Sequence, residues 1–251
     1  MKKLILVALF SVSALSHGYG DLGHKSVAAL AWKHLTPYGK QNVERILGLG
    51  QDAFINASVW ADHIKKDERF NYLKPMHYVN MPKDEKWYDR KRDCRKDRCV
   101  VEAIKHFSKV AKNGSEIEQI LALRMIIHLV ADVHQPLHAG LYEDRGGNWY
   151  EVHYQGNPVT LHKLWDHQMV ERMGEDVESV VAELEKVKAS VDVAAPVIWA
   201  QESHAITVNG VYDVNENQSV SDEYLVWADG VTRSQMAKAG WRLAMWLNKL
   251  W

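Results

Sequence analysis

The sequence contains few cysteines, only two among 251 residues, and they stand close together as Cys94 and Cys99. Because no second pair exists, the chain cannot form a four-thiolate zinc site. An even number of cysteines in an exported chain favours a disulfide, so we predict that these two close the charged loop between them. Two free thiols, or half of a metal-binding knuckle, are the alternatives.

The sequence also lacks an excess of positive charge, with 31 basic residues against 32 acidic ones. No overall basic field therefore exists to attract nucleic acid. Any contact with a polyanion must come from a local site, and bound divalent cations can reverse the sign of such a site.

The apolar run near the N-terminus, residues 4–12, is far shorter than the roughly 20 residues that a membrane span needs. It follows a basic start and precedes the small-x-small sequence Ser16-His17-Gly18, which is the pattern of a secretory signal peptide. We therefore expect residues 1–18 to be removed, with Tyr19 as the first residue of a periplasmic or secreted protein. A retained N-terminal anchor is the alternative.

Strand patterns are sparse. One hairpin is predicted, with strands at 149–154 and 158–161. Hydrophobic periodicity and helix-forming residues predict helices elsewhere, at residues 25–35, 38–47, 53–66, 99–111, 116–133, 176–191 and 219–250. The last helix is long enough to include a break near Asp222 or Gly230, and residues 209–217 are the most loop-like. We predict a mainly α fold, a single helical domain over residues 19–251 with one short β-hairpin.

One histidine–aspartate pattern occurs twice, as His128 with Asp132 and as His162 with Asp166. Residues four apart lie on the same face of a helix, one turn from each other, so each pair can share one divalent cation. An aspartate buried on the apolar helix 116–133 is costly without a partner, and a cation offsets that cost. A hydrogen-bonded core histidine is the alternative for a single pair.

Other candidate ligands lie outside these pairs. His138 follows the helix end expected at Pro136, Asp62 ends an apolar helical turn, and His77 enters a short extended segment. His24 is close to the predicted new N-terminus, whose amino group has a pKa near 8 and loses its proton readily to a metal. Nitrogen and oxygen ligands of this kind suit zinc.

These motifs resemble, in order, those of the zinc-dependent type I nucleases, the single-strand-preferring nuclease and 3′-nucleotidase family of fungi and plants, in a bacterial-looking form. The matching motifs are Gly23-His24, Trp60-Ala61-Asp62, His77-Tyr78, His128-x-x-x-Asp132, His138, Gly146-Gly147-Asn148 and His162-x-x-Trp165-Asp166. After about residue 175 only the helical character matches. The resemblance implies the trinuclear-zinc fold that these nucleases share with phospholipase C.

The resemblance also implies how three zinc ions are held. The ligands would be Asp62, His77, His128 and Asp132 for one ion, His138, His162 and Asp166 for a second, and His24, a bridging Asp132 and the main-chain amino and carbonyl groups of Tyr19 for the third. The family usually has Trp at the position of Tyr19. Because only main-chain atoms coordinate there, Tyr serves equally, provided that cleavage falls after Gly18.

The activity implied is that of a secreted endonuclease acting on single-stranded DNA and RNA, with 3′-nucleotidase activity. A metal-bound hydroxide would attack phosphorus in line, the zinc held by the His138 group would stabilise the leaving 3′-oxygen, and the products would carry 5′-phosphates. Asp62 would also orient the attacking water. We expect a monomer without stable membrane association.

Three residues near the ligands are candidates for substrate binding. Tyr78 follows a ligand directly and would stack on a base, Asn80 would reach a base edge, and Lys65 would contact phosphate. Packing for Tyr78, a strand end for Asn80 and an ion pair for Lys65 are the alternatives.

Two other functions fit the same ligands. A zinc-dependent phospholipase C uses the same metal arrangement, although an interfacial enzyme should show an apolar rim and the sequence has no distinct one. A secreted zinc-sequestering protein would bind metal without turnover.

Overall fold

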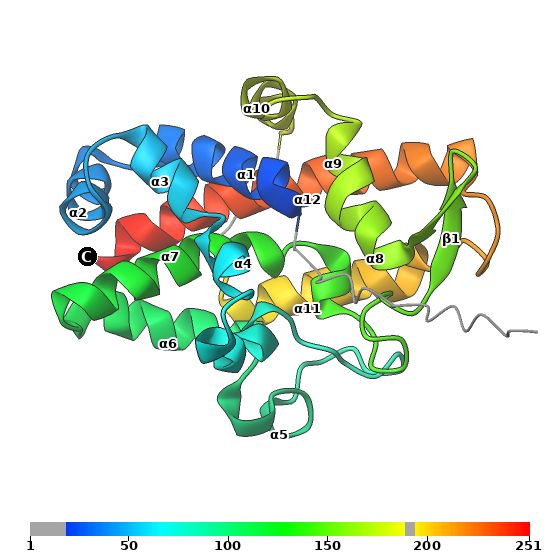
Figure 1. Ribbon diagram of the computed structural model, residues 1–251, viewed down its shortest axis with the longest axis horizontal. Helices are drawn as coiled ribbons and strands as arrows, with labels where there is room; N and C mark the ends of the chain where they lie inside the picture. Colours follow the sequence, from blue (N-terminus) through cyan, green and yellow to red (C-terminus); the bar gives the residue numbers. More distant parts are fainter. Residues whose placement is uncertain (1–18, 189–193) are drawn as a thin grey trace, which may run out of the picture.

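The computed structural model describes residues 19–188 and 194–251. The predicted signal peptide, residues 1–18, lies outside the described residues. The helix expected at 176–191 is shorter than predicted, because it ends at Glu185. The described chain is mainly helical with one two-stranded antiparallel sheet, which confirms the predicted fold class (Figure 1). In the described ranges no helix combines the length and apolar character that crossing a membrane requires.

The centre of the fold is made of long helices from the beginning, middle and end of the chain. Helix α1 (Gly20–His34) runs beside α12 (Asp222–Leu250), and both pack on α7 (Glu116–Asp132) (Figure 1). Helix α6 (Val100–Asn113) covers α7 from the other side. The main hydrophobic core lies among these four helices.

Helix α7 is the most deeply placed of the four. It begins with a capping box, in which Ser115 and Glu118 satisfy each other's main-chain N–H groups. Nearly every residue from Ala122 to Asp132 is buried. The broad apolar coverage of the sequence thus gives a helix surrounded by other elements, and it carries polar residues into that core.

Short elements link α1 to α6. They are α2 (Pro37–Leu47), α3 (Gln51–Ala57), α4 (Trp60–Ile64), the 3-10 helix η1 (Glu68–His77), α5 (Arg90–Asp93) and the 3-10 helix η2 (Arg95–Asp97). The single helix predicted at 53–66 is wrong, because the chain breaks at Ser58 and Val59 between α3 and α4. Cys94 and Cys99 form the predicted disulfide.

The elements after α7 are η3 (Pro136–Ala139), β1 (Glu151–Tyr154), β2 (Asn157–Thr160), α8 (Leu161–Lys163), the π-helix η4 (Leu164–Gln168), α9 (Met169–Glu171), α10 (Val177–Glu185), α11 (Pro196–Ile206) and the π-helix η5 (Thr207–Val211). A second, smaller core lies between the hairpin, the segment from α8 to α9, η5 and the start of α12, whereas α10 and α11 contribute to the main core. The hairpin turns at Gln155 and Gly156, which both have positive φ, and Tyr154 pairs with Asn157. Two positive φ values are typical of the tight turn that suits strand twist.

The C-terminal third differs most from the sequence-based expectation. No helix was predicted at α11, and η5 extends into residues 209–217, which were expected to be loop-like. The buried face of α11 includes Ser203 and His204 beside Trp199, so apolar periodicity is weak there. Helix α12 starts at Asp222, where Ser221 accepts a hydrogen bond from the Tyr224 N–H, and it continues unbroken through Gly230.

Candidate metal centre

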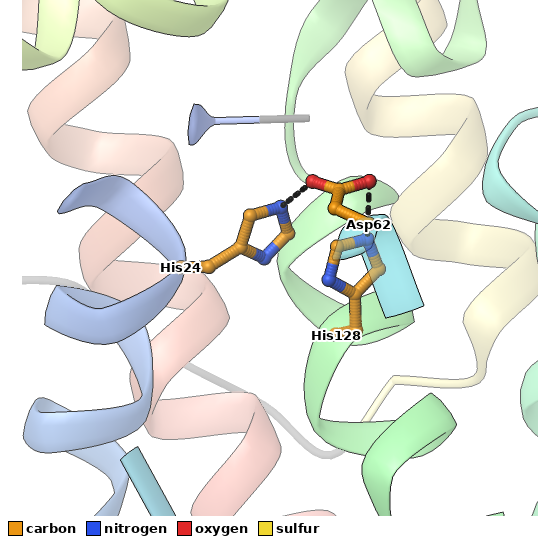
Figure 2. Close-up of side chains that lie close together, drawn as sticks. All are labelled: His24, Asp62 and His128. Carbon is orange, nitrogen blue, oxygen red and sulfur yellow. Dashed lines mark ion pairs between the residues drawn. The ribbon is translucent and has the colours of Figure 1, made fainter. Parts of the chain in front are cut away.

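Three helices distant in sequence bring the first group of candidate ligands together. His24 lies on α1, Asp62 on α4 and His128 on α7, and all three are buried. Figure 2 shows the Asp62 carboxylate beside both imidazoles, with Oδ2 3.9 Å from His24 Nε2 and Oδ1 3.5 Å from His128 Nε2. The two rings stack with centroids 3.9 Å apart. One ligand atom from each residue lies within 4.8 Å of the others, so the three can face a single ion.

Asp132 connects this group to a second one. It lies one turn after His128 on α7, and its Oδ2 is 3.1 Å from His128 Nε2 and 2.9 Å from His77 Nδ1. Its other oxygen, Oδ1, is 3.4 Å from His24 Nε2. A carboxylate whose two oxygens face different imidazoles has the geometry of a bridging ligand.

The third group consists of His138, His162 and Asp166. His162 Nε2 is 3.1 Å from Asp166 Oδ2, and His138 Nε2 is 3.9 Å from Asp166 Oδ1. His162 and Asp166 meet across the junction between α8 and the π-helix η4, rather than on one regular α-helix as expected. Single π turns inserted in helices are frequent at functional sites.

Main-chain hydrogen bonds hold two of the ligand-bearing segments together. The Val79 N–H donates to the His138 carbonyl at 2.8 Å, and the Met81 N–H donates to the Gly140 carbonyl at 2.9 Å. This short parallel pairing places the residue after η1 beside η3. The candidate ligands His77 and His138 are therefore positioned by backbone contacts that no helical pattern predicts.

Hydrogen bonds from Nδ1 to main-chain carbonyl groups fix the orientation of three of the imidazole rings. Each Nδ1 lies beside a main-chain carbonyl oxygen, with His128 at 2.7 Å from Ser58, His138 at 2.8 Å from His77 and His162 at 2.6 Å from Gly146. Because a carbonyl only accepts, the proton is on Nδ1, and the lone pair of Nε2 is left for a ligand bond. The break between α3 and α4 leaves the Ser58 carbonyl available for this contact.

Several side-chain nitrogen and oxygen atoms in the centre that could bind a metal are buried without a hydrogen-bond partner among the described residues. These atoms are both nitrogens of His24, Asp62 Oδ2, His77 Nε2, Asp132 Oδ1 and His138 Nε2. Leaving buried polar atoms unpaired costs about 1–3 kcal/mol each. Cations would satisfy the nitrogen and oxygen atoms that face one another, so the residues fit divalent metal ions.

The pKa values of the histidine and aspartate side chains also bear on metal binding. Burial lowers the pKa of His77 to about 3 and also lowers the pKa of His24, which keeps both rings neutral at pH 7. Burial alone would raise the pKa of Asp62, but the charges of His128 and Lys65 outweigh it and hold that pKa well below its usual range. Burial alone would lower the pKa values of His128 and His162, but the charges of Asp132 and Asp166 outweigh it and raise them. The centre therefore combines ionised carboxylates with neutral rings at His24 and His77, whereas a metal binding at His128 and His162 would displace a proton from each ring.

The candidate substrate-binding residues lie at the edge of this centre. Lys65 Nζ donates to Asp62 Oδ1 at 2.6 Å, which is the ion pair that the sequence left as an alternative to phosphate binding. Tyr78 is 43% exposed and follows His77 directly. Asn80 is half-buried, and its Oδ1 lies next to Gly146. These positions allow contact with a substrate, and their roles stay predictions.

Tyr19 is fully buried at the start of α1. Burial raises the pKa of its phenol, and the nearby carboxylates of Asp166 and Asp132 raise it further. A cavity of about 340 Å³ is lined by Tyr19, Gly20 and Asp166 among others. Tyr19 is thus close to Asp166 and Asp132, and coordination by its main-chain atoms beside His24 and Asp132 stays a prediction.

Other polar residues support the centre and were missed or only loosely placed by sequence reasoning. Gln135 Nε2 donates to Asp166 Oδ1 at 2.5 Å. His134 is fully buried, its Nδ1 contacts the Val130 carbonyl and its Nε2 accepts from Arg242 at 3.0 Å. Such contacts join residues with no shared motif, and the only signal in the sequence is their proximity to the ligands.

Comparison with known proteins gives one consistent result. A family model described as S1/P1 Nuclease matches residues 19–251. The chain is similar to Nuclease S1 of Aspergillus oryzae (29% identical, covering 97% of this chain and 96% of the relative) and to Endonuclease 2 of Arabidopsis thaliana (29%, covering 98% and 95%). It is also similar to Nuclease P1 of Penicillium citrinum (26%, covering 92% and 97%).

Proposed function

Because the chain belongs to the S1/P1 nuclease family and is therefore a phosphodiester hydrolase acting on nucleic acids, we propose that it is a zinc-dependent endonuclease for single-stranded DNA and RNA. Its products would carry 5′-phosphates, and it would also act as a 3′-nucleotidase. The observation that carries the proposal is the convergence of three buried groups of histidine and aspartate side chains, in which His24, Asp132 Oδ1 and His138 Nε2 have nitrogen or oxygen atoms without a hydrogen-bond partner among the described residues.

The chain's own residues have distinct roles in this proposal. Following the family pattern, Asp62, His77, His128 and Asp132 would hold one ion, His138, His162 and Asp166 a second, and His24, Asp132 and the main chain of Tyr19 a third. In the structure His24 lies close to Asp132 and also groups with Asp62 and His128. Zinc bound there would supply positive charge to the phosphodiester and a polarised water for attack on phosphorus.

Residues at the edge of the centre act on the substrate. Asp62, held by Lys65, orients the attacking water through the oxygen that is not paired with the lysine. The exposed ring of Tyr78 stacks on a base, and the Asn80 amide reads its edge.

The third ion depends on export and processing. Cleavage after Gly18 frees the amino group of Tyr19, and we propose that the mature enzyme is a secreted or periplasmic monomer. Mass spectrometry of the exported protein should give Tyr19 as the first residue. A surviving N-terminal extension should lower both the zinc content and the activity.

The decisive experiment is metal analysis combined with mapping of product ends on one short single-stranded oligonucleotide. The wild type should contain zinc and leave 5′-phosphate ends, and it should release nothing from phosphatidylcholine. Asp132→Asn keeps the side-chain shape but removes the bridging charge, so hydrolysis should be abolished and zinc content should fall toward one or two ions. Full activity of this variant, or a wild type without stoichiometric zinc, would refute the proposal.

A further inference from the structure

A second cavity lies outside the candidate metal centre, between the segment 83–87 and helix α11. Its volume is about 650 Å³. Its walls are formed by the segment 83–87 on one side and, on the other, by Ile198, Gln201, Glu202, His204, Ala205, Val208 and Asn209. None of these residues belongs to the proposed zinc ligands, so the cavity needs an explanation of its own.

Both walls of the cavity are fixed by hydrogen bonds. The Tyr88 N–H donates to Gln201 Oε1 at 3.1 Å, which ties the segment to α11. Arg92 donates to the Trp87 carbonyl at 2.8 Å and pairs with Glu85 at 2.9 Å. A cavity held in this way is largely preformed, as small-molecule sites usually are.

Helix α11 also connects the cavity to the metal centre. Nδ1 of His204 lies 2.9 Å from the carbonyl oxygen of Ala139, the residue after the ligand His138. His204 is 2% exposed, and its Nε2 has no hydrogen-bond partner among the described residues. His204 thus borders the cavity with one face and contacts, through Nδ1, the main chain next to His138.

The remaining lining is suited to a planar ring. The indole of Trp87 is 69% exposed and Ile198 is 40% exposed, although both border a hollow. Gln201 uses its oxygen to accept from the main chain, so its amide N–H groups can donate to a ligand. An aromatic surface beside amide and imidazole groups is the combination that binds a nucleobase by stacking with few direct hydrogen bonds.

The charges at the rim favour an anion. Glu85 is paired with Arg92, and Glu202 is paired with Arg242 at 2.7 Å. Among the described residues no ion pair engages Lys83, Lys86 or Asp84, which leaves two positive charges and one negative charge at the rim.

We propose that this cavity binds a nucleotide, with its base stacked on Trp87 and its phosphate near Lys83 and Lys86. The inference rests on the proposed nuclease function, which brings single-stranded substrate to the molecule. Tyr78 and Trp87 are nine residues apart, so they are separated by at most about 30 Å. A separation of this size is within the reach of a strand of several nucleotides, and the proposed occupant is either this strand or a released 5′-nucleotide.

The test compares Trp87→Ala with Tyr38→Ala, which removes another exposed aromatic ring, on α2. KM and kcat are measured for a thymidine dinucleotide and for a 20-nucleotide oligothymidylate, and binding of 5′-TMP is measured directly by equilibrium dialysis. If the strand occupies the cavity, Trp87→Ala raises KM for the long substrate about tenfold, as loss of one base stack predicts. KM for the dinucleotide and kcat stay unchanged, and Tyr38→Ala behaves as the wild type.

Binding of the free product has a different signature. In that case Trp87→Ala raises the Kd for 5′-TMP about tenfold in equilibrium dialysis and leaves both KM values unchanged. No change in either measurement, or an equal rise of KM for both substrates, overturns the proposal. Because dinucleotide cleavage is measured in every protein, failure of the nuclease function is seen separately as a wild type that cleaves nothing.

The lysines give a second, independent test. The binding constant K for the oligothymidylate is measured at several salt concentrations. In Lys86→Gln the slope of log K against the logarithm of the salt concentration should be smaller in magnitude by about 0.7, the value for one phosphate contact in a single strand. Lys112→Gln, at an exposed position near the end of α6, is the matched control and should leave the salt dependence unchanged. Equal salt dependences for wild type and Lys86→Gln would remove the phosphate contact from the proposal.

Discussion

Tyr19 Oη donates a 2.9 Å hydrogen bond to the main-chain carbonyl oxygen of His134, 115 residues later in the chain. His134 follows Asp132 by two residues, so the phenol is anchored to the segment that carries the proposed bridging ligand. The same carbonyl accepts a second hydrogen bond from Gln235 Nε2 on α12, at 3.1 Å. The side chain of the first described residue therefore holds its main chain beside the centre.

Tyr19→Phe tests whether this contact positions the new N-terminus. The variant keeps the buried ring, and Gln235 still occupies the carbonyl, so the free energy of unfolding should fall by only about 0.5–1.5 kcal/mol. Zinc affinity should fall more clearly, because the amino group is no longer held in place. Zinc content after dialysis against graded chelator measures this effect, and Tyr38→Phe on the surface is the control. Equal zinc retention by all three proteins would contradict the anchoring role.

Gly146→Ala should disturb the third ligand group through the backbone. Gly146 has φ +65°, and a Cβ there would overlap the carbonyl oxygen of Leu137. The Gly146 carbonyl accepts from His162, so the loop cannot shift without moving this ligand. We expect loss of one zinc ion and of most activity.

Gly156→Ala is the matched control for that substitution. Gly156 has φ +78°, a similar left-handed conformation, but a Cβ there has no neighbour within 4 Å. Backbone strain should destabilise both variants by roughly 1 kcal/mol, whereas only Gly146→Ala should lose zinc. If the two variants retain zinc equally, the close approach to Leu137 is not what orients His162.

Local patterns explain which parts of the fold could be predicted. The broad apolar run of residues 116–133, which starts with a capping box, predicts helix α7. The turn residues Gln155 and Gly156 between two alternating segments predict the hairpin. Helix α11 could not be predicted, because its buried Ser203 donates to the Val133 carbonyl and so replaces an apolar residue on the inner face. Tertiary hydrogen bonds of this kind leave no periodic signal.

The same distinction holds for the metal centre. The spacing of His128 and Asp132 predicts one face of a helix, and their ligand atoms lie 3.1 Å apart. The approach of His77 to Asp132 depends on backbone pairing between remote segments and came only from the family resemblance. The hydrogen bond from His128 to the Ser58 carbonyl could not be predicted, because the sequence predicts a continuous helix in which that carbonyl would accept a helical hydrogen bond.

The disulfide should stabilise the fold without contributing to metal binding. Cys94 and Cys99 are five residues apart, and closing so short a loop is worth about 2 kcal/mol in the chain-entropy model. The double variant Cys94→Ala/Cys99→Ala should lose this much in urea unfolding while keeping the zinc content of the wild type. Loss of zinc would show instead that the loop helps to hold η1 and its ligand His77.

His34, at the end of α1, should make stability depend on pH. Its ring stacks on Trp241 with centroids 3.5 Å apart, and burial lowers the pKa of the imidazole, with Glu185 opposing and Lys33 adding to the shift. The unfolded chain, with a pKa near 6.5, therefore binds a proton before the folded chain does. The stability that comes from neutral His34 is fully present above about pH 6.5 and is lost as the pH falls through the lower pKa of the folded state.

His34→Phe keeps a stacked ring that cannot be protonated. The free energy of unfolding, measured in urea at pH 7.5 and pH 5, should fall less for this variant than for the wild type. The metal ligands titrate in both proteins, so their contribution cancels in the difference. His106→Phe, at an exposed position on α6, controls for replacing a histidine with an aromatic ring and should show the wild-type pH dependence. If His34→Phe loses as much stability as the wild type between these pH values, the stacked ring is not the group that senses pH.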